Sequence, residues 1–182
     1  MMINTIYSIY YEGENMNLAL TGHRPQRLGF NDDEKSADYK SIKLWIKSNI
    51  EREILEHRKP VTVYCGMADG CDVAFGLVAC KLKENNRPVK LICVLPCKNY
   101  NSSHKYYSYL KEHADEWVEL SAEFYRGCDN VRDQYMVDHC DKLLAVWDGN
   151  KSGGVWSTIK KAKKAGKEIE YYKVNRGTQE KI

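Results

Sequence analysis

The sequence predicts a three-layer α/β domain built on a mainly parallel central sheet. Short apolar runs alternate along the chain with longer segments in which apolar residues recur at helical spacing. Several of these runs are almost continuously apolar, which is typical of strands that are covered on both faces. Because strand–helix–strand units connect through right-handed crossovers, this order favours parallel strands with helices on either side of the sheet.

Six strands and the helices between them follow in order along the chain. The strands are expected at residues 16–21, 61–65, 89–95, 117–120, 142–147 and 168–174. Three apolar stripes predict helices: Ile42, Trp45, Ile46, Ile50 and Ile54; Val73, Ala74, Leu77, Val78 and Leu82; and Val155, Ile159, Ala162 and Ala165–Gly166. A further helix, around Arg132, is expected before the fifth strand.

The length of 182 residues indicates a single domain, which we place at residues 16–182. Residues 1–15 fit no element of the alternation and stop before a second methionine, Met16. The string Glu-Gly-Glu-Asn at residues 12–15 can be encoded by purines that look like a bacterial ribosome-binding site, which makes residues 1–15 a translated leader. Their isoleucine- and tyrosine-rich start is equally compatible with an extra edge strand.

Composition excludes several classes of protein. Apolar residues make up 43% of the chain and charged residues 29%, as in ordinary globular proteins. No apolar run approaches the ~18 residues of a membrane span, and the start lacks a signal-peptide pattern, so a cytoplasmic location is expected. The seven cysteines contain no Cys-x-x-Cys pair, which favours buried thiols over a metal site. No metal and no cofactor are expected.

Positive charge is concentrated near the end of the chain. From residue 150 onward there are nine Lys or Arg residues against three Asp or Glu residues, including Lys160, Lys161, Lys163, Lys164 and Lys167. A basic helix of this kind is usually a solvated outer face. The alternative is a surface for nucleic acid.

Ligand binding is expected at the loops after the first, second and fifth strands, because doubly wound sheets bind ligands outside the carboxyl ends of their strands. These loops are residues 21–25, 66–70 and 148–154, and all three contain glycine, which lets a backbone approach a ligand closely. Asp69 and Asp148 are candidates to accept hydrogen bonds from ribose hydroxyls, and Arg24, Arg132 and Lys151 to bind phosphate. The chain has neither G-x-x-x-x-G-K-[ST] nor G-x-G-x-x-G, which argues against an ordinary ATPase or dinucleotide oxidoreductase.

Three blocks in this order resemble the YpsA-like branch of the SLOG superfamily. They are TGHRPQRLGF from residue 21, GMADGCDVA from residue 66 and NVRDQYMVDHCDKLLAVWDGNKSGG from residue 130. The resemblance covers residues 16–172 and implies a Rossmann-like fold with a nucleotide-derived ligand. The superfamily also contains LOG nucleotide hydrolases, the DNA-processing protein DprA, and sensor domains for ADP-ribose-derived signals in antiphage systems.

Comparison with the motif of the LOG hydrolases distinguishes the residues expected to bind a ligand from those needed for catalysis. Their motif Arg-Lys-x-x-Met is matched by Arg132 and Met136, with Asp133 in place of the lysine, and residues 152–154 align with their Pro-Gly-Gly. Their catalytic glutamate falls on Lys160, and a cationic amine cannot act as a carboxylate. Asp133 also replaces the asparagine that is usual in the YpsA-like pattern. The resemblance therefore implies the binding half of the site without its hydrolytic half.

The expected function is non-enzymatic binding of a nucleotide-derived small molecule, of the ADP-ribose or cyclic-nucleotide type, in order to sense it or to sequester it as a phage sponge would. The alternatives are a LOG-like hydrolase with a rearranged catalytic acid and a protein that binds single-stranded DNA as DprA does. The resemblance also implies a homo-oligomer, and the tyrosine-rich residues 100–109 are either a lid or an oligomer face. The expected ligand-binding residues are Thr21, Gly22, His23, Arg24, Gly66, Met67, Ala68, Asp69, Arg132, Met136, Asp148, Gly149, Ser152, Gly153 and Gly154.

Overall fold

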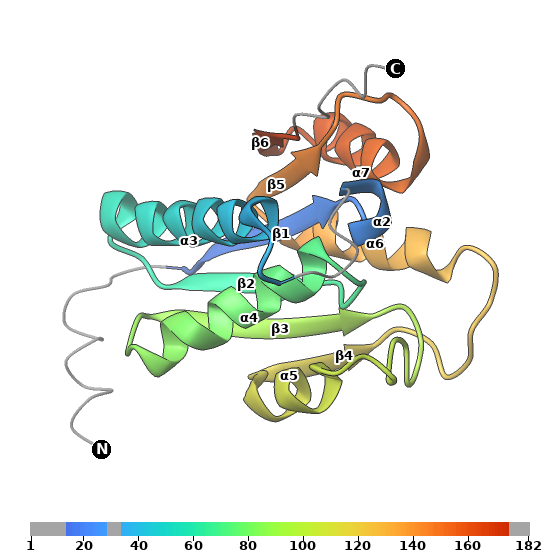
Figure 1. Ribbon diagram of the computed structural model, residues 1–182, viewed down its shortest axis with the longest axis horizontal. Helices are drawn as coiled ribbons and strands as arrows, with labels where there is room; N and C mark the ends of the chain where they lie inside the picture. Colours follow the sequence, from blue (N-terminus) through green and yellow to red (C-terminus); the bar gives the residue numbers. More distant parts are fainter. Residues whose placement is uncertain (1–13, 29–33, 175–182) are drawn as a thin grey trace.

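The computed structural model describes residues 14–28 and 34–174, which form one six-stranded sheet between two layers of helices (Figure 1). The strands are β1 (Met16–Gly22), β2 (Val61–Cys65), β3 (Val89–Leu95), β4 (Glu116–Glu119), β5 (Lys142–Trp147) and β6 (Glu168–Lys173). All five neighbouring pairs are parallel. The predicted Rossmann-like α/β fold is confirmed, with a sheet that is wholly rather than mainly parallel.

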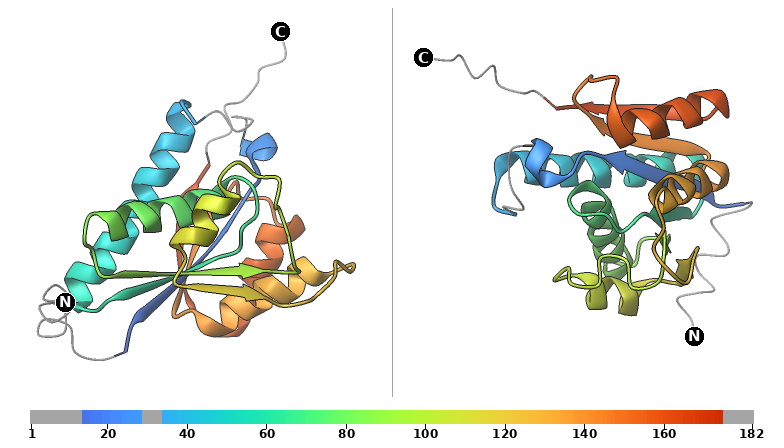
Figure 2. Two further views of the ribbon diagram at one scale, coloured as in Figure 1. Left: turned by 90° about the horizontal axis from the view of Figure 1, so that it is seen from below. Right: turned by 90° about the vertical axis from the view of Figure 1, so that its right-hand side faces the viewer.

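In the described ranges, six helices connect or flank the strands. They are α2 (Pro25–Leu28), α3 (Ala37–His57), α4 (Cys71–Glu84), α5 (Tyr107–His113), α6 (Cys128–His139) and α7 (Gly153–Lys164). Figure 2 shows α3, α4 and α5 on one face of the sheet and α6 and α7 on the other. The three predicted helical stripes lie on α3, α4 and α7, whereas the short helix α5 carries no stripe long enough to have been predicted.

Element boundaries follow the apolar pattern closely. All six strands match their expected ranges within one residue: β2, β3 and β5 match at both ends, β1 ends one residue late, β4 begins and ends one residue early, and β6 ends one residue early, at Lys173. Of the proposed leader or edge strand, residues 1–13 lie outside the described part of the chain. Asn15, just before β1, donates a hydrogen bond of 3.0 Å from its side-chain amide to Thr62 of β2.

The strand order is β4-β3-β2-β1-β5-β6, so the sheet changes direction of winding between β1 and β5. From β1 the chain winds outward through β2, β3 and β4. It then returns through α6 to place β5 on the other side of β1, where Leu20 pairs with Leu144. The loops after β1 and β5 diverge to opposite faces, and such a switch point opens a crevice at the carboxyl ends of the strands.

The helix layer of α3 and α4 seals one face of the sheet. Ser36 caps α3 by accepting a hydrogen bond of 3.1 Å from the backbone N–H of Tyr39, and the helix ends at Arg58 in the left-handed conformation. Its isoleucine stripe is buried; full burial of one such side chain contributes about 1.5–3 kcal/mol. A buried ion pair of 2.7 Å between Lys142 and Glu53 joins the start of β5 to α3. That pair lies at the end of the strand opposite to the crevice.

Within the described ranges, no helix has the length and apolar character needed to cross a membrane. All seven cysteines are buried thiols, as the sequence predicts. Residues 14–28 and 34–174 also hold no group of three or more His, Cys, Asp or Glu side chains arranged to bind a metal ion.

Candidate functional site

A cavity of about 420 Å³ lies at the switch point, where the loop after β1 meets the starts of α4, α6 and α7. Its volume is within the range of small-molecule sites, roughly 300–1,000 Å³. The walls come from four separate stretches of sequence: Leu20, Thr21, Gly22, His23, Arg24, Gln26, Arg27, Ala68, Asp72, Asp129, Arg132, Asp133, Met136, Gly154 and Val155.

Eight of the fifteen predicted ligand-binding residues line this cavity. All four predicted residues of the first block, Thr21, Gly22, His23 and Arg24, line the cavity, whereas Ala68 is the one predicted residue of the second block that does. The other three are Arg132, Met136 and Gly154. The structure thus brings the three motif blocks together at one cavity, and the blocks differ in how many of their predicted residues line it.

The other predicted residues of the second block, Gly66, Met67 and Asp69, do not line the cavity. The carbonyl of Gly66 accepts a hydrogen bond from Arg132 Nη1, and a Cβ at Gly66 would lie 2.6 Å from that nitrogen. Asn101 donates hydrogen bonds to the carbonyl of Met67 at 2.9 Å and to Asp69 Oδ1 at 2.7 Å. The absence of a side chain at Gly66 therefore makes room for an arginine.

The loop after β5 is also turned mostly away from the cavity, since Asp148, Gly149, Ser152 and Gly153 do not line it. Asp148 is buried, and its carboxylate accepts from His23 Nε2 at 2.9 Å and from Arg27 Nε at 3.0 Å. Burial alone would raise the pKa of Asp148, but hydrogen bonds from the Asn150 backbone, Arg27 and His23 hold it well below its ordinary value. Asp148 thus fixes two residues of the first block, in contrast to the expected role as a partner of ribose hydroxyls.

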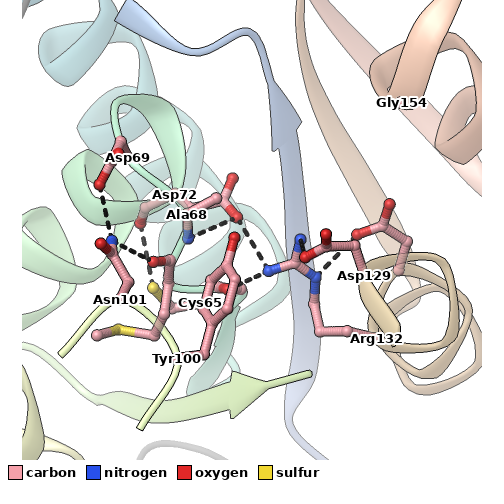
Figure 3. A network of polar contacts seen from close by, with 12 residues as sticks. Cys65, Ala68, Asp69, Asp72, Tyr100, Asn101, Asp129, Arg132 and Gly154 are labelled. Atoms are coloured by element: carbon pink, nitrogen blue, oxygen red, sulfur yellow. Dashed lines mark hydrogen bonds and ion pairs between the residues drawn. The ribbon is translucent and has the colours of Figure 1, made fainter. Parts of the chain in front are cut away.

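Arg132, a candidate to bind phosphate, lines the cavity but is only 5% exposed. Figure 3 shows its guanidinium between Asp129 and the segment that holds Ala68 and Asp72. Arg132 Nε donates to Asp133 Oδ1 at 2.8 Å, and its Nη atoms lie 3.7 Å from Asp72 and 3.8 Å from Asp129. Burial would lower the pKa of Arg132, yet these carboxylates raise it above its ordinary value. The guanidinium is a charged centre that organises three acidic side chains.

These acidic side chains differ in how they are satisfied. Asp133 accepts from Arg132 and, at 3.1 Å, from the Thr158 hydroxyl, while Asp72 accepts from the backbone N–H of Ala68 at 3.4 Å. In Asp129, the atom Oδ1 is buried and has no hydrogen-bond donor among the described residues. Buried acceptors without a hydrogen-bond donor are rare in native structures. The nearest cation to this oxygen is Arg132 Nη2, at 3.8 Å, which is beyond hydrogen-bond distance.

The part of the cavity formed by the start of α7 is positively polarised. The helix α7 begins at Gly153 with no side-chain cap, and its first turn contains no acidic residue. The N–H groups of such a first turn lack partners within the helix and favour anions. Arg27 Nη1 would lie 3.8 Å from a Cβ on Gly153, so a guanidinium stands beside this helix terminus.

The sequence reasoning missed seven lining residues, of which Arg27, Asp72, Asp129 and Asp133 are charged. Asp72 follows Cys71 inside a segment that is otherwise apolar, and a carboxylate at such a position is the signal that could have identified it. Arg27 lies three residues after Arg24 in the first block. Asp129 and Asp133 are four residues apart in α6, so a helix predicted over these residues also predicts that their side chains share one face.

Burial raises the pKa of Asp72 to about 6, against the opposing effect of Arg132. A carboxyl group whose pKa is raised by folding stabilises the native state below its unfolded pKa of 3.8, and this contribution is lost as pH rises through about 6. In the wild type, Asp72 should therefore lower the free energy of unfolding by about 2–3 kcal/mol between pH 4 and pH 7. The variant Asp72→Asn, which has no titrating group at this position, should not show this fall. Urea unfolding of both proteins at several pH values measures this difference in slope, whereas parallel curves would contradict it.

Comparison with known proteins places the chain in a family. The model of the YpsA family, described as the YspA SLOG family, matches residues 18–178. A UPF0398 protein of Bacillus cereus strain B4264 is 24% identical over 169 residues, which cover 85% of this chain and 86% of the relative. UPF0398 proteins of B. cereus strains G9842 and ATCC 14579 match with the same identity and coverage.

Proposed function

Because the chain belongs to the YpsA family of SLOG proteins, we propose that it binds a nucleotide-derived small molecule in the switch-point cavity. The ligand class is the ADP-ribose-type or cyclic-nucleotide signal, and binding serves to sense the molecule or to sequester it. One observation carries the proposal: a single cavity presents a helix terminus suited to an anion together with a buried carboxylate oxygen that accepts no hydrogen bond from a described residue.

The donors and the acceptor that line the cavity suit different parts of a nucleotide. A phosphate beside Arg27 and the first turn of α7 would receive backbone N–H and guanidinium donors. A ribose hydroxyl or a base amino group would donate to Asp129 Oδ1. Asp72 and Asp133 are engaged by Arg132, Ala68 and Thr158, which leaves them as a fixed negative wall.

A hydrolase remains the second candidate, because three carboxylates line the cavity and the pKa of Asp72 is raised to about 6. A protonated carboxyl group of that pKa is a suitable general acid for cleavage of a glycosidic bond. Two features favour binding without turnover. Lys160, which aligns with the LOG glutamate, is exposed and does not line the cavity, and Asp133 is held by two protein donors.

The proposal is tested by the small molecules that the protein retains. Protein purified from cells is denatured and its supernatant analysed by mass spectrometry, with Gly154→Val as the matched control. We expect a nucleotide mass from the wild type and none from the variant. Absence of any such compound, together with no heat of binding for millimolar AMP, ADP-ribose or cyclic ADP-ribose, would overturn the proposal.

The same protein distinguishes the alternatives. Incubation with AMP, other nucleoside monophosphates and cyclic ADP-ribose, followed by chromatography, is expected to show no release of free base. Repeated turnover that disappears in Gly154→Val would instead identify a hydrolase. Tight binding to a labelled single-stranded oligonucleotide, steeply weakened by salt and lost when Lys160, Lys161, Lys163 and Lys164 are changed to Glu, would identify a DNA-binding protein. Homo-oligomerisation stays a prediction from the family.

A further inference from the structure

A second hollow, of about 480 Å³, is lined by residues of α3 and α4. These two helices lie on the sheet face opposite to α6 and α7 (Figure 2). Its residues are separate from those of the switch-point cavity. Four aliphatic side chains contribute its apolar surface: Leu44, Leu77, Val78 and Leu82. Leu44 is 64% exposed, whereas Leu82 is part of the core, so the groove leads from solvent to the interior of the helix layer.

The rim of this groove carries charge of one sign. About two turns of α3 contribute Lys40, Lys43 and Lys47, and α4 contributes Lys81, while the remaining polar residue is the neutral Asn85. None of the lining residues is acidic. The ammonium groups of Lys47 and Lys81 lie 2.6 and 2.9 Å from glutamates of their own helices. Exposed pairs of this kind contribute only about 0–1 kcal/mol, so both lysines are free to exchange partners.

We propose that the groove between α3 and α4 docks an amphipathic helix of another protein, with an apolar stripe facing the groove and acidic residues along its flanks. A helix laid into a groove uses apolar anchors at positions i, i+3, i+4 and i+7, which matches an elongated apolar floor between two helices. Carboxylates on both flanks of that helix would meet the lysines of α3 on one side and Lys81 of α4 on the other.

Charge decides among the possible occupants. In a two-fold contact between copies of this chain the same patch faces itself, and four lysines would meet four lysines. Residues 1–13 of this chain contain one charged residue, Glu12, so that segment cannot supply flanking carboxylates. An anionic membrane would attract the lysines, but a flat surface cannot fill a hollow of this volume. An acidic helix satisfies both the shape and the charge.

Fluorescence anisotropy with a designed probe tests the proposal. The probe is a labelled helical peptide of about 18 residues with leucines at i, i+3, i+4 and i+7 and glutamates on both flanks; its control has lysines in place of the glutamates. We expect the acidic peptide to bind at least about tenfold more tightly than the basic one, a difference of about 1.4 kcal/mol. The preference should shrink as salt is raised.

Three variants locate the site. Leu44→Ser and the double variant Lys43→Glu with Lys47→Glu should each weaken binding of the acidic peptide at least about tenfold. Leu55→Ser is the matched control, since Leu55 is an equally exposed leucine of α3 that does not line the groove, and binding should be unchanged. Circular dichroism confirms that all three variants fold, as expected for changes at surface positions.

Several outcomes would overturn the proposal. They include equal affinity for the two peptides, no binding of either, and equal effects of Leu44→Ser and Leu55→Ser. A dimer in light scattering that Leu44→Ser dissociates would assign the groove to a second copy. Sedimentation with phosphatidylglycerol vesicles that Leu44→Ser abolishes would assign it to a membrane. None of these results depends on whether the switch-point cavity binds a nucleotide.

Discussion

Arg132→Ala is expected to lower the free energy of unfolding by about 3–5 kcal/mol at neutral pH, the usual effect of removing one partner of a buried ion pair. The guanidinium is 5% exposed and is the cation that the carboxylates of Asp72, Asp129 and Asp133 share. Without it, Asp72 would remain buried beside a second carboxylate and would have to ionise unpaired or bind a proton. Urea unfolding measures the loss.

The matched control for this prediction is Arg126→Ala, because Arg126 is an exposed arginine in the loop before α6. It should change the free energy of unfolding by no more than about 0.5 kcal/mol. Arg132→Lys, which keeps the charge but loses the two-pronged donor geometry, should retain the fold and lose part of the stability. The double variant Arg132→Ala with Asp72→Asn should recover part of the loss, since the unpaired carboxylate is then gone. A single variant Arg132→Ala as stable as Arg126→Ala would contradict this account.

Gly154→Val is expected to leave the fold intact and to weaken nucleotide binding at least about tenfold, or about 1.4 kcal/mol. Gly154 lines the cavity, and a Cβ built on it meets no atom within 4 Å, so the added side chain would fill open space of the cavity where we propose that the ligand binds. Calorimetry with AMP and ADP-ribose measures the affinity. A thermal shift that the nucleotide produces in the wild type should be absent in the variant.

The neighbouring Gly153 is the control that distinguishes the effect of filling the cavity from the effect of backbone strain. Gly153 has a φ of +77°, a conformation that side chains rarely adopt, so Gly153→Ala should lower stability by about 1 kcal/mol. Gly154 has no such constraint. If Gly154→Val lost stability as Gly153→Ala does while nucleotide affinity stayed unchanged, the cavity would not be the binding site.

The strands were predictable because their apolar runs are short, nearly continuous and separated by regular helical patterns. Residues 61–65 and 142–147 are buried almost throughout, and such runs have few alternatives to a central strand. The strand order was not predictable in the same way. Nothing local in the sequence shows that β5 returns to pair with β1, because this pairing joins residues that are far apart along the chain.

The loops that form the candidate site could be predicted from the sequence, but the directions in which their side chains point could not. The motif blocks identified the loops, and their shared location at one edge of a parallel sheet follows from topology. Which carboxylate faces the ligand depends on side-chain partners that composition does not reveal. Asp148 turns inward because His23 and Arg27 hold it, while Asp72 reaches the cavity from inside an apolar segment of α4.

The strand order has a consequence for synthesis on the ribosome. The central strand β1 is made first among the described strands, and β2 can pair with one of its edges early, whereas the partner of its other edge, β5, emerges about 120 residues later. At about 5–20 residues per second this delay lasts roughly 6–24 seconds. During that time an unpaired edge in the middle of the sheet is a template for wrong pairing. A nascent chain that stops before Lys142 therefore has an open central edge, and its cavity lacks only the wall that Gly154 and Val155 supply.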